Sequence, residues 1–228
     1  MMNTRPLLWR KRSLLLALFS CFNVSALGAE TPIRFPDLFV LGVEVGGKAT
    51  LQSVVEKFGA TRIWTSGDAS TGADELCYIL VNNKFEAIMR VVSVGEAATH
   101  IGQINAIILL GPEENVPFRS RCARKEVSSQ PFISDLGLAI GMSKAEVESA
   151  LRHQATFKSG AFSMDFKRTI FLRKDDPILR RDDPEYADWA ASLSCSKPNY
   201  EDFAHIEVVL LHGRASRIQV SRNQQPGC

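Results

Sequence analysis

The feature that most constrains this chain is a short pattern that occurs twice. Residues 136–151 read LGLAIGMSKAEVESAL, and residues 41–55 read LGVEVGGKATLQSVV. The offset between the copies is 95 residues as far as the turn glycine, Gly46 against Gly141, and 96 residues from the lysine onward. Self-similarity at a fixed offset indicates a repeated structural unit. The pattern therefore predicts a duplicated domain in which the first turn is one residue shorter than the second.

Each copy is typical of a strand, a tight turn and a helix. Residues 136–140 alternate between large and small side chains as a half-buried strand does, and the glycine that follows permits the chain to reverse. Ser143 and Glu146 have the spacing of a capping box. In the first copy we expect Gly47 to take the cap position, which glycine tolerates, and Gly59 to end the helix. Both helices carry an apolar stripe, so we expect them to pack on a sheet.

Apolar runs follow each helix and predict antiparallel strands. The predicted strands are residues 76–81, 85–94 and 101–110 in the first copy, and residues 162–172, 206–211 and 216–221 in the second. We therefore expect an α+β fold of two tandem repeats, each a helix packed on a three-stranded or larger antiparallel sheet. The predicted boundaries are 30–112 for the first repeat, 113–130 for a polar linker and 131–228 for the second repeat.

Residues 1–29 are typical of a signal peptide that directs export. Four basic residues precede a short apolar segment, and small side chains suit cleavage after Ala26 or after Gly28. A membrane-spanning helix needs about 20 apolar residues, and this segment is shorter and interrupted. Residues 18–21 also resemble a lipobox, in which Cys21 would carry a lipid. We therefore expect a periplasmic protein without a membrane span, and an outer-membrane lipoprotein anchored through Cys21 is the alternative.

The charge of the chain argues against a nucleic-acid partner. The full sequence has a formal net charge of +2, and removal of the four basic leader residues changes it to −2. Proteins that bind nucleic acids usually present a basic surface. We therefore expect no binding of nucleic acids.

Four cysteines remain after the leader and suggest two disulfide bonds. Exported proteins meet an oxidising environment, in which paired cysteines are common. Four cysteines allow three pairings, but the repeats favour one of them. In each copy one cysteine lies between the helix and the last strand and one lies just beyond that strand, so we expect Cys77 to pair with Cys122 and Cys195 with Cys228. The spacing lacks the paired C-x-x-C pattern of zinc sites, so we expect no metal.

The second copy carries an insertion, residues 174–202, that the first copy lacks. A connection of this length is usually functional or disordered. The insertion contains Tyr186, Trp189 and Tyr200, and aromatic side chains supply much of the binding energy of typical protein interfaces. These three residues are the candidate protein-binding site. In the alternative, Trp189 packs against its own domain, and the sheet faces around Tyr78 and Arg217 are the next candidates.

No motif of a known catalytic site occurs in the sequence. The four histidines lie outside any H-E-x-x-H pattern, and neither a G-x-S-x-G elbow nor a phosphate-binding glycine loop is present. We therefore predict no catalytic residues, no cofactor and no enzymatic activity. Because catalytic triads assemble from residues distant in sequence, an enzyme with an unrecognised site is kept as the third hypothesis.

A family resemblance adds to this interpretation. Residues 141–151, GMSKAEVESAL, resemble the start of the small outer-membrane assembly lipoprotein family (SmpA/OmlA, or BamE-like), whose pattern is Gly-Met-Ser/Thr-Lys-x-x-Val followed by a leucine. Two such units in tandem resemble the β-lactamase inhibitory protein (BLIP-like) fold, in which the sheets of two repeats form one concave antiparallel surface that grips an enzyme. The resemblance implies an exported, non-enzymatic binding module.

These observations lead to one expected function and one main alternative. We expect a periplasmic protein-binding module, such as an inhibitor or immunity-type protein that occludes another envelope or secreted protein. The alternative is an envelope or outer-membrane assembly factor, which a lipid on Cys21 would favour.

Overall fold

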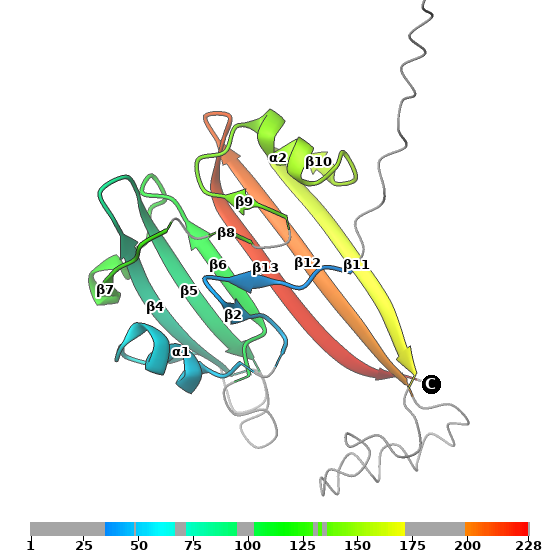
Figure 1. Ribbon diagram of the computed structural model, residues 1–228, viewed down its shortest axis with the longest axis horizontal. Coiled ribbons are helices and arrows are strands. Elements are labelled where there is room, and N and C mark those ends of the chain that lie inside the picture. The colour runs from blue at the N-terminus through cyan, green and yellow to red at the C-terminus, as the bar shows by residue number, and fades with distance from the viewer. Residues whose placement is uncertain are drawn as a thin grey trace, which may run out of the picture. The chain divides into compact units, whose positions relative to one another are not determined.

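One large antiparallel sheet dominates the structure (Figure 1). The computed structural model describes residues 35–47, 49–66, 72–94, 103–129, 132–133, 136–171 and 199–227. The strands of this main sheet are β3 (Trp64–Ser66), β4 (Ala73–Val81), β5 (Glu86–Val94), β6 (Ala106–Leu110), β7 (Ala123–Glu126), β10 (Thr156–Lys158), β11 (Ala161–Phe171), β12 (Asn199–Leu211) and β13 (Arg214–Gly227). Their order is β10-β11-β12-β13-β6-β5-β4-β3. The remaining strand, β7, pairs with β4 in parallel, beyond the residues of β4 that pair with β3.

The main sheet consists of two groups of three long strands that meet at β6 and β13. β4, β5 and β6 form one group, and β11, β12 and β13 form the other. At the junction Ile107 lies opposite Val220, and Leu109 lies opposite Ile218. All four side chains are fully buried. The apolar faces of the two groups therefore continue into one another without a break.

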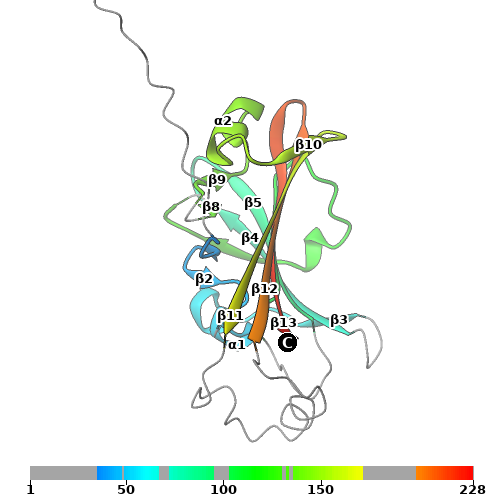
Figure 2. The same cartoon turned by 90° about the vertical axis from the view of Figure 1, so that its right-hand side faces the viewer.

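A second, smaller sheet lies on one face of the main sheet. It contains β1 (Phe39–Val40), β2 (Val43–Glu44), β8 (Phe132–Ile133) and β9 (Leu138–Ala139), in the order β2-β1-β8-β9. The segments that precede the two helices thus pair with each other, with Val40 opposite Ile133. Figure 2 shows β2, β8 and β9 on the same side of the main sheet as the helices α1 (Leu51–Phe58) and α2 (Lys144–Ala150). We call this covered side the inner face.

The predicted capping box of the second helix is confirmed. Ser143 precedes α2, and its hydroxyl accepts a hydrogen bond from the backbone N–H of Glu146 at 3.3 Å. The Glu146 carboxylate in turn accepts from the backbone N–H of Ser143 at 2.6 Å. This reciprocal pair satisfies two backbone donors that the helix itself leaves free. Gly141 precedes the cap with φ +87°, a backbone conformation that favours glycine.

The predicted cap of the first helix is wrong. Thr50, and not Gly47, caps α1, because the Thr50 hydroxyl accepts from the backbone N–H of Ser53 while the Ser53 hydroxyl accepts from the backbone N–H of Thr50. A glycine has no side chain with which to satisfy those donors. Three residues separate Gly46 from this cap, and one residue separates Gly141 from Ser143. The first turn is therefore two residues longer than the second, and not one residue shorter.

The hydrophobic core fills the space between the inner face and the elements that cover it. α1 contributes Leu51, Val54 and Phe58 to this core, and the Phe58 ring lies 5.5 Å from the ring of Tyr78 on β4. Tyr78 is fully buried, and its hydroxyl donates to the carbonyl oxygen of Gly59 at 2.9 Å. Burial raises the pKa of the Tyr78 phenol. Tyr78 therefore belongs to the core and does not lie on an exposed sheet face.

The expected fold class, an α+β arrangement of two helix-on-sheet repeats, is wrong. The structure is 53% strand and 13% helical, and its described residues contain two α-helices of eight and seven residues. The strands do not form one sheet per repeat but a single large sheet. The strands predicted over 76–81, 206–211 and 216–221 were too short, whereas the one predicted over 101–110 was too long, since β6 begins at Ala106. β13 for example spans Arg214–Gly227, whereas the apolar run predicted residues 216–221.

Two segments that were expected to lack regular structure contain part of the main sheet. The predicted linker 113–130 includes the 3-10 turn η1 (Arg119–Arg121) and β7. The predicted insertion 174–202 ends inside β12, because that strand begins at Asn199. Polar strand residues such as Asp202 made both segments look like loops. The boundaries proposed for the two repeats stay a prediction.

The caps lead to a test on the first helix. Thr50→Ala should lower the free energy of unfolding by about 0.5–2 kcal/mol, because the backbone N–H of Ser53 loses its acceptor, whereas Thr50→Ser should preserve that stability. Gly47→Ser should give no stabilisation, since a Cβ there would lie 1.9 Å from the Glu44 carboxyl carbon and must displace that side chain. Urea unfolding followed by circular dichroism measures all three. A stabilised Gly47→Ser together with an unchanged Thr50→Ala would restore glycine as the cap.

Candidate functional site

The outer face of the main sheet, opposite the helices, is the candidate functional site. Strand alternation directs every second side chain of β11, β12 and β13 to this face. None of the outward side chains whose burial is described is buried. We call this set of side chains the open face; it comprises Ser163, Asp165, Lys167, Glu201, Phe203, His205, Glu207, Arg217, Gln219 and Ser221.

Two ion pairs and one histidine–carboxylate contact cross between neighbouring strands of the open face. His205 Nδ1 lies 2.7 Å from a carboxylate oxygen of Asp165, Lys167 Nζ lies 2.7 Å from one of Glu201, and Arg217 lies 2.9 Å from one of Glu207. All six side chains are at least 31% exposed. Ion pairs in such positions contribute about 0–1 kcal/mol each to stability.

The weak internal pairing leaves these charges available to a partner. Exposed charges of both signs set the specificity and the association rate of protein complexes more than they set affinity. The Lys167 ammonium also lies 5.1 Å from the centre of the Phe203 ring. The open face thus combines alternating charges with an aromatic ring, a combination that suits contact with another protein surface.

The other half of the outer face is crossed by residues 111–122, which we call the crossing segment. From the end of β6 it passes over β5 to β4, and Val116 packs against Cys77, Ile88 and Leu110. These four side chains are at most 9% exposed. They form a second, smaller core on the outer face. The crossing segment therefore closes over β4–β6 and leaves β11–β13 open.

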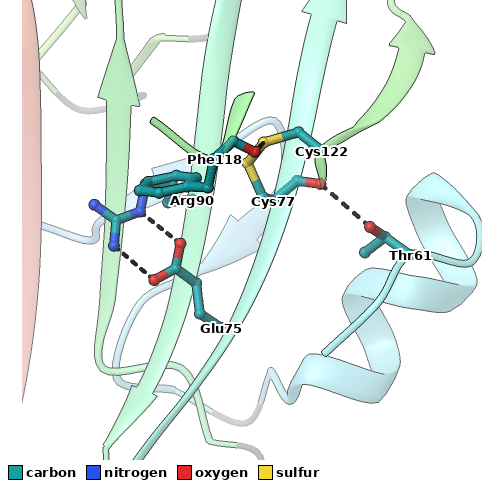
Figure 3. The surroundings of a disulfide bond; sticks show 6 residues. All are labelled: Thr61, Glu75, Cys77, Arg90, Phe118 and Cys122. Carbon is teal, nitrogen blue, oxygen red and sulfur yellow. Dashed lines mark hydrogen bonds and ion pairs between the residues drawn. A yellow bond between two sulfur atoms is a disulfide. The ribbon is translucent and has the colours of Figure 1, made fainter. Parts of the chain in front are cut away.

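A disulfide between Cys77 and Cys122 fastens the crossing segment to β4, as the predicted pairing expects (Figure 3). The Cα atoms of the two residues lie 4.7 Å apart. Cys77 can reach the segment because it occupies an outward position on β4, between the inward residues Leu76 and Tyr78. The second predicted pair, Cys195 with Cys228, lies outside the described residues and stays a prediction.

An ion pair and an aromatic ring lie next to this disulfide. Arg90 donates two hydrogen bonds to the carboxylate of Glu75, at 2.5 and 2.6 Å. The same guanidinium lies 4.8 Å from the centre of the Phe118 ring, and Figure 3 shows the two groups stacked beside the disulfide. Two-point pairing of this kind holds an arginine in one orientation. Arg90 therefore fixes the position of Phe118 in the crossing segment.

A buried ionic network lies on the inner face near the start of β12. Asp202 is fully buried and accepts hydrogen bonds from Arg222 at 2.7 and 2.9 Å and from Arg168 at 2.7 and 2.9 Å. Burial by itself raises the pKa of Asp202, but the hydrogen bonds from Arg222 and Arg168 outweigh it, so the pKa lies below its usual value. The hydrogen bond to Asp202 likewise raises the pKa of Arg222. Both groups stay charged and are fully paired, as structural ion pairs are.

The turn at Gly46 belongs to the same network. Gly46 has φ +69°, and a Cβ built on it would lie 2.6 Å from the stem of the Arg222 side chain. Its backbone N–H donates to the carbonyl oxygen of Ile104 at 2.6 Å. Glu44, two residues earlier, lies 3.9 Å from the Arg222 guanidinium. The bare glycine therefore allows the turn to lie directly against Arg222.

The structure brings together few of the residues that the sequence predicted as a binding site. Tyr186, Trp189 and Cys21 lie outside the described residues, and for Tyr200 only the backbone, in β12, is described. Arg217 lies on the open face, whereas Tyr78 lies in the core. The insertion therefore stays a predicted site.

Of the open face, only the surroundings of Arg217 were among the predicted candidates, although the sequence contains a signal for the rest. Ser163, Asp165 and Lys167 alternate with the buried residues Phe162, Met164 and Phe166. This period of two predicts a strand with one polar face and one apolar face. We used that pattern to predict a strand but not to assign a surface.

The buried network leads to a test with a matched control. Asp202→Asn should cost about 3–5 kcal/mol at pH 7, because two arginines lose a buried partner. Asp165→Asn, which changes an 80% exposed carboxylate on the adjacent strand, should cost less than about 1 kcal/mol. Because the folded-state pKa of Asp202 is lowered, its stabilisation is full above the unfolded value of about 4 and is lost as the pH falls through the folded value.

The deficit of Asp202→Asn relative to wild type should therefore shrink at pH 3. Guanidinium chloride unfolding at pH 7 and pH 3 measures it. Equal, small losses for the two variants at pH 7 would contradict the assignment of Asp202 to a structural network.

Neither a metal-binding cluster nor a membrane-spanning helix is found among the described residues. They contain no group of three or more His, Cys, Asp or Glu side chains that could hold a metal ion. In the same residues we find no helix with the length and apolar character needed to cross a membrane. Comparisons with protein-family models, with curated proteins and with solved structures find no match to this chain.

Proposed function

We propose that this chain is an exported protein-binding module that occludes another protein of the cell envelope with its open face. The observation that carries the proposal is the open face itself, a three-stranded surface with exposed charges of both signs and the half-buried aromatic ring of Phe203. The inner face is filled by α1, α2 and the small sheet, so the open face is the large sheet surface that remains for a partner.

Two further observations support export and binding. The disulfide between Cys77 and Cys122 suits an oxidising compartment, to which the signal-like residues 1–29 would direct the chain. The two copies of the repeat pattern resemble BLIP-like proteins, in which one continuous antiparallel surface grips an enzyme. The continuity of the main sheet across β6 and β13 supports the same mode of binding here.

Site-specific photo-cross-linking tests the proposal. A benzophenone amino acid in place of Phe203 should yield one discrete cross-linked product in the envelope, because this ring belongs to the open face. The matched control replaces Phe157, which is 43% exposed and belongs to β10 at the edge of the main sheet, and it should yield no such product. Mass spectrometry of the Phe203 product identifies the partner.

A charge reversal on the open face provides the second arm of this test. Asp165→Lys should reduce the yield of the Phe203 product about tenfold or more without a change in melting temperature. Glu148→Lys on α2, which reverses an exposed charge away from the open face, should leave the yield unchanged. Equal products from positions 203 and 157, or no product from either, would refute the proposal.

A second candidate function is an envelope or outer-membrane assembly factor. It is favoured by the lipobox-like residues 18–21 and by the resemblance of residues 141–151 to the BamE-like pattern. This function predicts that the mature chain begins at Cys21 and carries a lipid there. Intact mass of the protein purified from envelopes measures this directly. An unmodified amino terminus near residues 27–30 would exclude the lipoprotein and leave the periplasmic module.

A further inference from the structure

A second surface, at the opposite edge of the main sheet from β10 and β11, has the features of a ligand site. It surrounds Trp64 in β3, which lies opposite Glu75 on β4 and therefore projects to the outer face. The guanidinium carbons of Arg62 and Arg121 lie 4.3 and 4.8 Å from the centre of the Trp64 ring. Two cations thus lie against one indole ring, and they come from segments almost sixty residues apart in the sequence.

These two cations have no acidic partner within the described part of the chain. Neighbouring arginines are paired, Arg90 with Glu75 and both Arg119 and Arg124 with Glu86, but no ion pair among the described residues involves Arg62 or Arg121. Stacking on an aromatic face leaves the N–H groups at the edge of a guanidinium free to donate. The two positive charges around Trp64 therefore lack the carboxylates that their neighbours have.

A small cavity opens beside this pair of cations. Its volume is about 130 Å³, and it is lined by Trp64, Glu75, Cys77, Phe118 and Arg121. An apolar cavity of about 150 Å³ holds a benzene ring, so this space suits one aromatic or branched aliphatic side chain. The walls are rigid because the disulfide and the Arg90 stack hold Phe118 and β4 in place.

The one acidic group of the cavity is already neutralised. Glu75 uses both carboxylate oxygens to accept hydrogen bonds from Arg90. Toward the cavity lie two aromatic rings, a disulfide sulfur and the charge of Arg121, which no described carboxylate pairs. A ligand that suits this cavity has an apolar side chain that fills it and a carboxylate beside that side chain.

We propose that the cavity at Trp64 binds an acidic peptide segment of a protein partner, with one aromatic or aliphatic side chain in the cavity and neighbouring carboxylates paired to Arg62 and Arg121. Charge complementarity carries this choice of occupant, because the site combines an anchor-sized cavity with two guanidinium groups that no carboxylate among the described residues neutralises. Arginine and tryptophan are enriched among the residues that contribute most to protein binding, and such residues cluster in well-packed pockets. The inference rests on residues separate from the open face.

Fluorescence of Trp64 reports on occupancy of the cavity. The chain contains three tryptophans, so Trp9→Phe and Trp189→Phe in the full-length protein leave Trp64 as the sole emitter. The probe is the blocked peptide Glu-Asp-Phe-Asp-Glu. The control peptides are Gln-Asn-Phe-Asn-Gln, which lacks the charge, and Glu-Asp-Gly-Asp-Glu, which lacks the anchor. We expect the probe peptide to change the emission of Trp64 saturably, and each control peptide to bind about tenfold or more weakly.

Matched double variants test the two arginines. Arg62→Gln with Arg121→Gln should weaken binding of the acidic peptide about tenfold or more. Lys57→Gln with Lys158→Gln removes the same net charge from exposed positions on α1 and β10 and should leave the affinity within about twofold. An equal loss in both double variants would show that net charge alone is responsible and would overturn the proposal.

Two measurements on the unmutated arginines keep the test independent of folding. Affinity for the acidic peptide should fall as salt is raised from 50 to 500 mM, as expected for charge pairing. Inorganic phosphate should produce no saturable change of its own at millimolar concentration. A salt-independent affinity, a full response to phosphate, or equal binding of the neutral peptide would each refute the site. Because cross-linking at Phe203 uses the other half of the sheet, either proposal can fail while the other stands.

Discussion

The pairing of β6 with β13 is the contact on which the rest of the structure depends. It joins β4–β6 to β11–β13 through Ile107, Leu109, Ile218 and Val220, four fully buried side chains. Five pairs of opposing residues join β6 to β13, and this contact holds the two groups of strands together. The pairing of β1 with β8 repeats this connection in the small sheet above. The outer face inherits the same continuity, so the open face and the crossing segment are two parts of one surface.

Local patterns predicted the positions of most long elements, but not how they assemble. The alternation in residues 162–166 predicts β11 because polar and apolar side chains lie on opposite faces, and the Ser143–Glu146 spacing predicts the cap of α2 because both partners are only three residues apart. Such signals are carried by near neighbours. The pairing of Val40 with Ile133 depends on residues 93 positions apart, and neither two-residue strand has a period that can be detected. For this reason the second sheet and the mostly β fold class were not predicted.

The candidate site was predicted less well, because burial of charge cannot be read from composition. Asp202 and Arg222 lie on the inner face, a position that charged residues rarely occupy without partners. Arg168 and Arg222 are 34 and 20 residues from Asp202 in sequence, so no local pattern joins the three. The Trp64 surface is similar, since Arg62 adjoins the tryptophan in sequence but Arg121 reaches it through the crossing segment. In both cases the fold supplies the partner.

The close contact between Gly46 and Arg222 has a consequence for how sequences with this fold can diverge. A side chain at position 46 would occupy the space of the Arg222 stem, and a shorter residue at position 222 would remove a donor from buried Asp202. Neither position is therefore free to drift by itself. Glycine, arginine and aspartate at positions 46, 222 and 202 therefore depend on one another, although they come from three separate segments. In related chains we expect the three to be kept together or replaced together, as a correlated substitution and not as independent changes.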